Sequence, residues 1–394
     1  MTIKKYNLAI VQTHATQFDG PLFKQLSKNP NIELTVYYTK FLGKAPFDKE
    51  IGRSPDWDND VADGYCYKTK KPGFFNACRF IVQIIKGGHN LVIVSGNSAI
   101  FRFFLALCLR LNGVSVGLRS DMILLYAQPH SAKSILKNIL WPFLFKLYSS
   151  GHPTGTLAEE YLLKYGFSRD HIFRFPYTVD NNYIAERCRR YRKHRNRLRK
   201  ALNIKSDSFV VLGIIKFNER EDPMTLVLGF AGILENYPDA HLVLVGDGTM
   251  MDDIRNIISQ KNILNVHLPG FVNYRRLPLF YSIADVFVHP PVQESWGVSI
   301  NEAMVCGLPV IVANTVGSHI DLVKLGETGF VFEAKNSKNL TEYLIKLTDD
   351  PILRQKMGNN SRELIKSWNY DYIGESLLKA LASVKSKANR EIYD

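Results

Sequence analysis

The segment His289–Val312 reads HPPVQESWGVSINEAMVCGLPVIV and carries two glutamates, Glu294 and Glu302, among residues that form and end turns. It begins within one β-branched apolar run, DVFVHP, and finishes in a second such run, LPVIV. The residues between the runs, Val298–Cys306, are predicted to form a helix that ends at Gly307. A helix between two buried strands is typical of a parallel α/β unit.

The same alternation of apolar runs and helix-period stretches continues through both halves of the chain. The runs predicted as strands are LAIV, LTVYY, LVIV and VSVGL in the first half and FVVLGII, HLVLVG, DVFVHP and LPVIVA in the second. Two Rossmann-like parallel sheets are therefore predicted, and a length of 394 residues also favours two domains. We expect a first domain over residues 1–180, a basic linker over 181–205 and a second domain over 206–366. The last segment, 367–394, contains an amphipathic helix that is predicted to pack back on the first domain.

Charge is distributed unevenly along the chain. The net charge is +13, with +9 in residues 1–180, +9 in residues 181–205 and −5 in the remainder. Hydrophobic content of 46% and charged content of 22% exclude a disordered or coiled-coil protein.

The cysteines and the apolar segments indicate the compartment. The five cysteines form no CxxC pair, which predicts reduced thiols and argues against a zinc site or a disulfide framework. The N-terminal apolar run lacks a small-residue cleavage site and is predicted as a strand, not as a signal peptide. No stretch reaches the roughly 18 uninterrupted apolar residues that a transmembrane helix needs. These features predict a cytoplasmic protein.

The loop ESWG lies at the carboxyl end of a predicted parallel strand and at the amino end of a predicted helix, where ligands bind in open α/β sheets. Backbone N–H groups from Ser295 to Ser299 could meet an anion such as a diphosphate. Gly297 would let the main chain approach that anion closely. Ionised carboxylates only accept hydrogen bonds, so Glu294 and Glu302 suit sugar hydroxyls. Each glutamate alone is also explained as a helix-capping or dipole-neutralising residue, and that alternative stays open.

The spacing of these two glutamates resembles the E-x7-E signature of retaining glycosyltransferases of family 4. Neighbouring segments match that family in order and spacing: ADVFVHP (284–290), ESWGVSINEAM (294–304), GLPVIVA (307–313) and GETGFVF (326–332). Residues 206–366 thus resemble the donor-binding domain of a GT-B enzyme, in which two Rossmann-like domains face a central cleft. The resemblance implies metal-independent transfer with retention of anomeric configuration, the leaving phosphate taking the acceptor's proton.

Family 4 enzymes grip the donor diphosphate with an arginine and a lysine after the first strand of this domain. In GIIKFNEREDP, Lys216 takes the place of the arginine, whereas Glu221 stands where the lysine is expected and Arg220 directly precedes it. The resemblance implies catalytic roles for Glu294, Lys216 and Arg220. The donor-binding residues that it implies are Gly20, Gly246, Gly270, Phe271, Val272, Ser295, Trp296, Gly297, Val298 and Glu302.

Segments of the first half resemble a bacterial subgroup of the family that acts in surface-polysaccharide assembly. They are DKEIGRSPDWDNDVADGY (48–65), LRSD (118–121) and FPYTVD (175–180). Many family members carry a histidine near the strand end that LRSD represents. This chain has Arg119 and Asp121 there instead, so these two are the acceptor-side candidates, and a buried structural ion pair between them is the alternative.

The resemblance implies a glycosyltransferase that moves a sugar from a nucleotide-diphosphate sugar to a saccharide or a lipid-linked saccharide. UDP- and GDP-sugars are the expected donors, and capsule, O-antigen or exopolysaccharide synthesis is the expected role. One alternative is a nucleotide-sugar epimerase, which shares the GT-B architecture. The other is a non-catalytic basic protein that binds a membrane or nucleic acid.

Two basic segments suggest a surface for anionic partners. Residues 187–200 have one aromatic residue and no groove-reading motif, so a solvated helix or one facing anionic lipid is favoured over nucleic-acid binding. Residues 133–148 mix lysines with aromatic residues, as an interfacial helix does, although a core helix with snorkelling lysines is the alternative. The hypothesis is peripheral attachment to the cytoplasmic leaflet through Trp141, Phe143 and Phe145, beside Lys133, Lys137 and Lys146.

Overall fold

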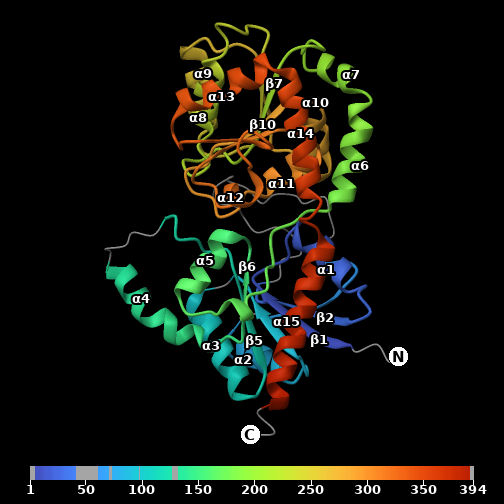
Figure 1. Cartoon of the computed structure of the whole chain (residues 1–394), viewed down its shortest axis with the longest axis vertical. Coiled ribbons are helices and arrows are strands. Elements are labelled where there is room, and N and C mark those ends of the chain that lie inside the picture. The colour runs from blue at the N-terminus through green and yellow to red at the C-terminus, as the bar shows by residue number, and fades with distance from the viewer. Residues whose placement is uncertain (1–4, 41–60, 71–72, 97, 127–131, 391–394) are drawn as a thin grey trace. The chain divides into compact units, whose positions relative to one another are not determined.

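The computed structural model describes residues 5–40, 61–70, 73–96, 98–126 and 132–390 (Figure 1). These residues form two compact units. The first unit contains the described residues up to Thr178 together with those from Tyr370 onward, and the second is Val179–Asn369. Residues 48–60, part of the segment that resembles a bacterial subgroup, lie outside the described residues.

The first unit is built on a six-stranded sheet in the order β3-β2-β1-β4-β5-β6, with every pair of neighbours parallel. Its strands are β1 (Tyr6–Gln12), β2 (Ile32–Tyr38), β3 (Cys66–Thr69), β4 (Leu91–Val94), β5 (Ser115–Ser120) and β6 (Ser150–Pro153). Its helices are α1 (Asp19–Leu26), α2 (Phe74–Ile85), α3 (Ala99–Leu111), α4 (Ala132–Phe145), α5 (Thr156–Lys164) and α15 (Tyr370–Arg390), with a 3-10 turn at Arg169–His171.

Both faces of this sheet are buried, because alternate residues of β1 enter two different cores. Leu8 and Ile10 pack with α1 and α15, whereas Ala9 and Val11 pack with α2, α3, α4 and α5. Strands covered on both faces need continuous apolar runs, which is why LAIV and LVIV show no polar alternation.

The C-terminal helix α15 belongs to the core of the first unit. Ile373, Leu377, Leu381 and Val384 recur every three or four residues and are buried in the same cluster as Phe23 of α1. Figure 1 shows α15 in red alongside the blue α1. A segment more than 300 residues away in the chain therefore completes one face of the first sheet.

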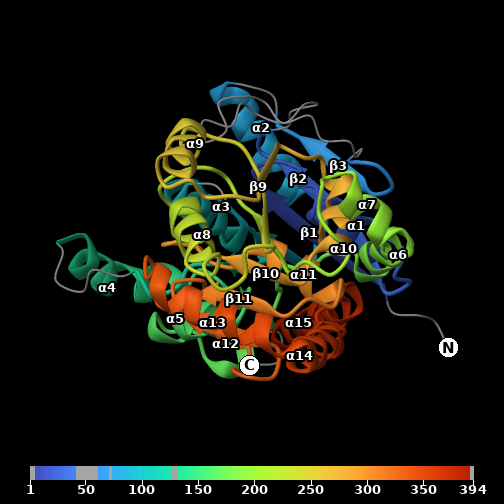
Figure 2. The same ribbon diagram turned by 90° about the horizontal axis from the view of Figure 1, so that it is seen from above.

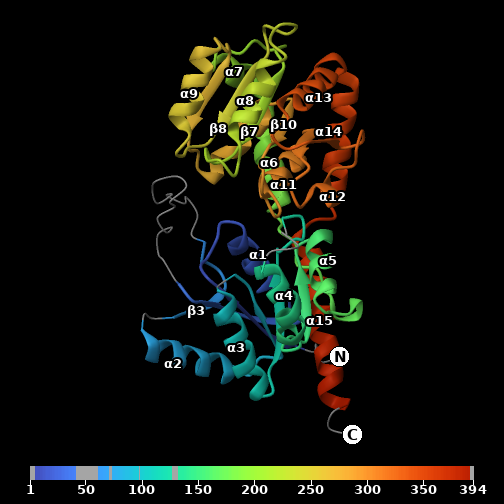
Figure 3. The ribbon, with the colours of Figure 1, turned by 90° about the vertical axis from the view of Figure 1, so that its left-hand side faces the viewer.

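The second unit contains another six-stranded sheet, in the order β12-β11-β10-β7-β8-β9 and again parallel throughout. Its strands are β7 (Val210–Ile214), β8 (His241–Val245), β9 (Val266–Gly270), β10 (Val286–His289), β11 (Val310–Ala313) and β12 (Gly329–Phe332). Its helices are α6 (Asn181–Arg192), α7 (Arg195–Lys200), α8 (Pro223–Ala231), α9 (Met251–Gln260), α10 (Leu277–Ile283), α11 (Val298–Val305), α12 (His319–Leu322), α13 (Ser337–Asp349) and α14 (Pro351–Ile365), with a 3-10 turn at Tyr274–Arg276. Figure 3 shows β7, β8 and β10 side by side.

The basic segment 181–205 is not a separate linker, because it folds as α6 and α7 within the second unit. Arg199 is buried and donates hydrogen bonds to backbone carbonyls, including that of Ile283, and to the Asp285 carboxylate. Arg195 donates to the other oxygen of Asp285 at 2.6 Å. Part of the positive charge in this segment therefore serves packing.

The α/β fold class and the eight predicted strands are confirmed. Four strands were not predicted: β3, β6, β9 and β12. Two of these, with the sequences SGHP and VHLPG, contain glycine and proline, which are depleted in strands. Among the described helices, none combines the length and apolarity needed to cross a bilayer.

Replacing Leu377 by alanine should lower the free energy of unfolding of the first unit by about 2–5 kcal/mol, because the side chain is fully buried against α1. The measurement is urea unfolding followed by hydrogen exchange of peptides from β1 and β4. Leu111→Ala, at a position that is 78% exposed, is the control and should change the value by less than about 0.5 kcal/mol. Equal effects of the two variants would show that α15 does not stabilise this core.

Candidate active site

Four adjacent strands of the second unit carry the predicted donor-site residues just beyond or at their carboxyl ends. Lys216 follows β7, Gly246 follows β8, Gly270 ends β9, and the loop with Glu294 follows β10. Because these strands are neighbours in the order β10-β7-β8-β9, the sheet brings together segments that are far apart in the sequence. This edge is where open α/β sheets bind ligands.

Glu294 is held at both carboxylate oxygens. Arg220 donates to Oε2 at 3.2 Å, and the backbone N–H of Trp296 donates to Oε1 at 3.2 Å. The side chain is 20% exposed. The carboxylate is therefore oriented and still reaches solvent.

The predicted replacement of the family lysine by Glu221 has a structural consequence. Arg220 donates to Glu221 at 2.8 Å as well as to Glu294, so one guanidinium is shared by two carboxylates. Burial raises the pKa of Glu221 to about 7, and Glu294 adds to this rise, while the charges of Arg220 and Lys216 oppose it. Arg220 thus lies beside the E-x7-E loop, with its charge partly neutralised.

The helix α11 begins directly after this loop, beside β10 and β11 (Figure 2). The expectation that every N–H from Ser295 to Ser299 is available is wrong for Trp296, which donates to Glu294. Within the described residues, the N–H groups of Val298 and Ser299 have no acceptor, and no side chain caps the helix. The start of α11 therefore offers backbone donors to an anion.

Gly297 is required by the geometry of the loop. Its φ is 83°, in the left-handed region, and a Cβ there would lie 2.8 Å from Nε2 of His289. A side chain at this position would be strained and would collide with the ring of His289.

His289 and Asn218 are site residues that the sequence analysis did not identify. His289 is buried at the end of β10, and neither ring nitrogen has a hydrogen-bond partner among the described residues. Burial lowers the pKa of His289 to about 4, so the ring is neutral at pH 7, with one donor and one acceptor. The amide nitrogen of Asn218 is also buried without a partner. Unpaired buried polar groups are rare, so they mark this loop cluster as a place where a ligand could bind.

Glu302, the second glutamate of the E-x7-E spacing, is buried. Its side chain lies on α11, is 3% exposed, and accepts a hydrogen bond at 2.7 Å from the hydroxyl of Tyr281 on α10. Burial raises the pKa of Glu302 to about 7. The predicted contact with a ribose diol stays a prediction.

The glycines after β8 and β9 have different structural roles. A Cβ on Gly246 would lie 1.8 Å from the carbonyl oxygen of Ile215, so only glycine fits there. Gly270 has a φ of 77° and open space around it, and its carbonyl accepts a hydrogen bond from the N–H of Gly246. Phe271 and Val272 follow in a half-buried loop.

In the first unit, Arg119 and Asp121 do not form the ion pair that was considered. Arg119 is buried, donates to Asp19 at 3.2 Å, and lies over the ring of Phe175. Asp121 instead accepts a hydrogen bond from the hydroxyl of Tyr177 at 3.2 Å. Charge neutralisation by Asp19 explains how a guanidinium is buried here.

Two further residues, Gly20 and His14, lie at this edge of the first sheet. Gly20 lies in the first turn of α1, where a Cβ would meet the carbonyl oxygen of Val61 at 2.5 Å. His14 follows β1, and burial lowers its pKa while Asp19 opposes that shift. His14 is thus a half-buried histidine close to Asp19, the partner of Arg119, and it was not among the predicted site residues.

Replacing Glu302 by glutamine should remove a pH dependence of stability. The pKa of Glu302 is raised in the folded protein, so the folded state binds the proton more tightly and loses stability as the pH rises from about 4.5 to above 7. A pKa shift of that size lowers the free energy of unfolding by about 3 kcal/mol at pH 8. Glu302→Gln should restore this stability, because the neutral amide oxygen can still accept the hydrogen bond from Tyr281. Urea unfolding at pH 5 and pH 8 measures the difference, and parallel pH profiles of the two proteins would contradict it.

Comparison with known proteins finds similarity to glycosyltransferases. Residues 194–364 match the family model described as glycosyl transferases group 1. The chain is 30% identical to the GDP-mannose-dependent monoacylated alpha-(1-6)-phosphatidylinositol monomannoside mannosyltransferase of Corynebacterium glutamicum, over 47% of this chain and 50% of that protein. It is 31% identical to the UDP-Gal:alpha-D-GlcNAc-diphosphoundecaprenol alpha-1,3-galactosyltransferase of Escherichia coli, over 43% of this chain and 44% of that protein. The chain thus spans about half the length of these curated relatives.

A solved structure extends the likeness in fold to both units. HepE of Anabaena in complex with UDP has a TM-score of 0.72 at 15% identity, covering 96% of this chain and 100% of that one. Identity at this level shows the fold alone, which is GT-B. The match of residues 194–364 to the group 1 model agrees with the resemblance to family 4 glycosyltransferases that the sequence motifs indicate.

Proposed function

We propose that the protein transfers a sugar from a nucleotide-diphosphate sugar to a saccharide or lipid-linked acceptor, with retention of anomeric configuration. The observation that carries this proposal is the placement of Glu294, oriented by Arg220 and the N–H of Trp296 at the start of α11. A nucleotide-diphosphate sugar is already activated. The protein therefore has to stabilise the leaving diphosphate and hold the acceptor hydroxyl in line.

The leaving diphosphate would be stabilised by groups from two loops. Lys216 and Arg220 follow β7. The N–H groups of Val298 and Ser299, which have no acceptor among the described residues, begin α11. Donors that are fixed before the reaction need no reorganisation as negative charge develops on the leaving oxygen. A donor-derived phosphate oxygen would take the proton of the acceptor hydroxyl, so no nucleophile from the protein is required.

Glu294 would hold hydroxyls of the transferred sugar. Both of its oxygens already have donors from the protein, and each oxygen has a further lone pair for a sugar hydroxyl. His289 and Asn218 would gain partners from the bound donor, because both carry unpaired polar atoms beside the same loop.

The names of the relatives support this class of substrates. One is named for GDP-mannose and a phosphatidylinositol mannoside, and the other for UDP-Gal and a diphosphoundecaprenol-linked saccharide. A further match is named as the capsular polysaccharide biosynthesis glycosyltransferase CapM of Staphylococcus aureus. We infer a role in building a surface polysaccharide or glycolipid.

Replacing Glu294 by glutamine should reduce turnover at least about tenfold, because a neutral amide weakens the hydrogen bonds that hold the donor sugar and no longer pairs with Arg220.

Lys216→Ala should reduce turnover more than Arg220→Ala, since Arg220 is already shared by two carboxylates. Glu219→Gln is the matched control, because Glu219 is exposed in the same loop. Release of UDP or GDP from a panel of donors, with a saccharide acceptor, is the measurement.

The same assay separates the proposal from its alternatives. Interconverted nucleotide sugar in the absence of acceptor would indicate an epimerase. No turnover with any donor, and no thermal stabilisation by nucleotide sugars, would indicate a non-catalytic protein.

We further propose that the first unit attaches reversibly to an anionic membrane surface, where a lipid-linked acceptor would be met. Along α4, the exposed residues Ile135, Leu136, Ile139, Leu140 and Phe143 recur with helical spacing and form one apolar stripe. On α3, Ile100, Phe104, Leu107 and Leu111 form another exposed stripe. Exposed apolar surface of this extent is unusual in a protein that contacts only water.

The residues that would contact lipid differ from those predicted. Phe143 is exposed, but Phe145 is buried in the core and Trp141 donates a hydrogen bond to Tyr161, so neither of the last two forms the contact. Lys137 and Lys146 lie over the rings of Trp141 and Phe143 and flank the stripe. The side chain of Lys133 lies outside the described residues.

Replacing Leu136 and Ile139 together by serine should reduce attachment to vesicles containing phosphatidylglycerol, because about 0.8 kcal/mol is lost for each CH₂ group no longer buried in lipid. The control is Leu325→Ser with Ile352→Ser, a pair in the second unit that is even more exposed than Leu136 and Ile139. Sedimentation with anionic and neutral vesicles at low and high salt is the measurement. If anionic vesicles retain no more protein than neutral ones at low salt, the membrane contact is wrong.

A further inference from the structure

The first unit contains a cavity of ≈ 410 Å³ at the amino ends of β5 and β6. Ser115, the first residue of β5, and Ser149, directly before β6, line it, and Val384 of α15 lies against it. Ligands of parallel α/β sheets bind at the carboxyl ends of the strands. This cavity is at the opposite edge of the sheet, so it is separate from the edge that holds Arg119 and Asp121.

The lining of this cavity is rich in hydrogen-bond donors and has no carboxylate. Arg110, Lys146 and His171 supply the basic groups, and none of the lining residues is acidic. Arg110 donates to the hydroxyl of Ser149, a neutral group, at 3.2 Å. Because no lining residue is acidic, the charge of Arg110 is not neutralised within the cavity. Polyol sites use carboxylate and amide acceptors, whereas a donor-rich lining suits an oxyanion.

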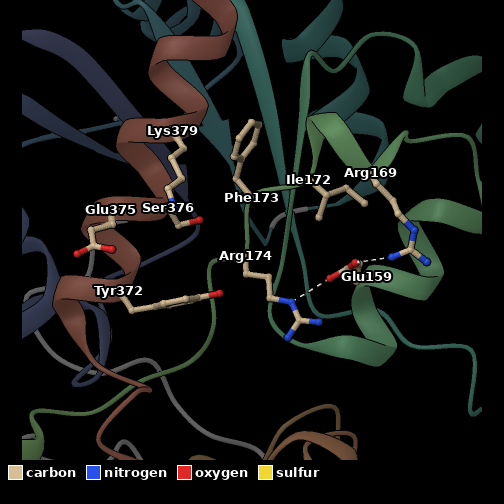
Figure 4. A pocket seen from close by; sticks show the side chains of 9 residues that line it. All are labelled: Glu159, Arg169, Ile172, Phe173, Arg174, Tyr372, Glu375, Ser376 and Lys379. Carbon is tan, nitrogen blue, oxygen red and sulfur yellow. Dashed lines mark hydrogen bonds and ion pairs between the residues drawn. The ribbon is translucent and has the colours of Figure 1, made fainter.

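A second pocket of the same unit is lined by acidic as well as basic residues. This pocket, of ≈ 250 Å³, lies between α15 and the segment after α5 (Figure 4). Arg169 and Arg174 both donate to Glu159, which Figure 4 shows between them. Arg169 and Arg174 of that pocket already share an anionic partner, whereas no lining residue of the larger cavity is acidic.

Tyr148 adds an observation that charge alone does not provide. A cation in the last turn of a helix is favoured by the helix dipole, so Arg110 at the end of α3 does not by itself indicate a ligand. Tyr148 lines the cavity, is only 6% exposed, and its hydroxyl has no hydrogen-bond partner among the described residues. Burial raises the pKa of Tyr148, so the hydroxyl keeps its proton and remains a donor.

We propose that this cavity binds a phosphate group, carried by the headgroup of an anionic phospholipid. Arg110 and Lys146 would pair with the phosphate oxygens, and the hydroxyl of Tyr148 would donate to one of them. Phosphate oxygens only accept hydrogen bonds, which matches a lining of donors.

Exposed apolar residues next to the cavity favour a lipid as the source of the phosphate. Leu111 directly follows Arg110 and is 78% exposed, and Phe143, 66% exposed, lies under Lys146 at 5.6 Å from its nitrogen to the ring centre. Both would lie beside the acyl region of a lipid whose headgroup entered the cavity. The assignment to a lipid rests on the membrane contact proposed above, whereas phosphate binding does not.

The test is isothermal titration of the full chain with three probes: dihexanoylphosphatidylglycerol below its micelle concentration, glycerol 3-phosphate and inorganic phosphate. We expect saturable binding that is tightest for the phospholipid. Arg110→Gln and Tyr148→Phe should each weaken it about tenfold, because each removes a hydrogen bond to a charged group. Arg169→Gln makes the same change in the smaller pocket, where Arg169 pairs with Glu159. It should leave the affinity for the phospholipid within about twofold, because an exposed ion pair contributes little.

Several outcomes would overturn the proposal. Absence of saturable binding by all three probes, or equal losses in Arg110→Gln and Arg169→Gln, would show that the cavity is not a phosphate site. Inorganic phosphate or glycerol 3-phosphate binding as tightly as the phospholipid would overturn the lipid source.

The membrane contact and the phosphate site can be tested independently of each other. The double change at Leu136 and Ile139 should reduce attachment to vesicles but leave binding of monomeric phospholipid intact. Tyr148→Phe removes only a hydroxyl that has no partner among the described residues, so this variant is expected to fold. It therefore still tests the proposal if the Arg110→Gln variant does not fold.

Discussion

Glu294 connects two loops that follow neighbouring strands, and the geometry of the candidate site depends on this connection. Arg220 comes from the loop after β7 and Trp296 from the loop after β10, and both donate to the same carboxylate. The carbonyl of Glu294 also accepts a hydrogen bond from the N–H of Gly317, beyond β11. A single residue thereby links the carboxyl ends of three adjacent strands, directly before α11 begins.

Near this residue, some buried polar atoms have no hydrogen-bond partner within the part of the chain that the structure describes. Both ring nitrogens of His289 and the amide nitrogen of Asn218 have no hydrogen-bond partner among the described residues. His289 ends β10, where the charge of Glu294 acts on it, and the side-chain oxygen of Asn218 accepts from the N–H of Glu221. Such groups lower the stability of the folded protein. They also provide fixed donors and acceptors that a polar ligand could use without displacing an internal hydrogen bond.

The two units use charged and apolar residues differently. In the second unit, Arg195 and Arg199 neutralise Asp285 and tie α7 to α10 and β10, so a strongly basic segment becomes part of the packing. In the first unit, α3 and α4 leave apolar stripes exposed, and the cavity nearby is lined by cations without acids. These differences are why we assign donor chemistry to the second unit and membrane and lipid contacts to the first.

The sequence by itself determined the α/β class, the eight strands made of uninterrupted apolar residues, and the loop in which Glu294 lies. These follow from local patterns, since buried parallel strands need apolar runs and a turn before a helix needs residues such as Gly297. Only the tertiary structure decided that Asp19 is the partner of Arg119, that Arg199 is buried, and that Glu302 faces Tyr281. Each of these contacts joins residues between 21 and 100 positions apart, and their burial depends on how helices and strands pack. Residue type and spacing carry no information about such partners, because the partner of a buried charge is set by the fold and not by its neighbours in the chain.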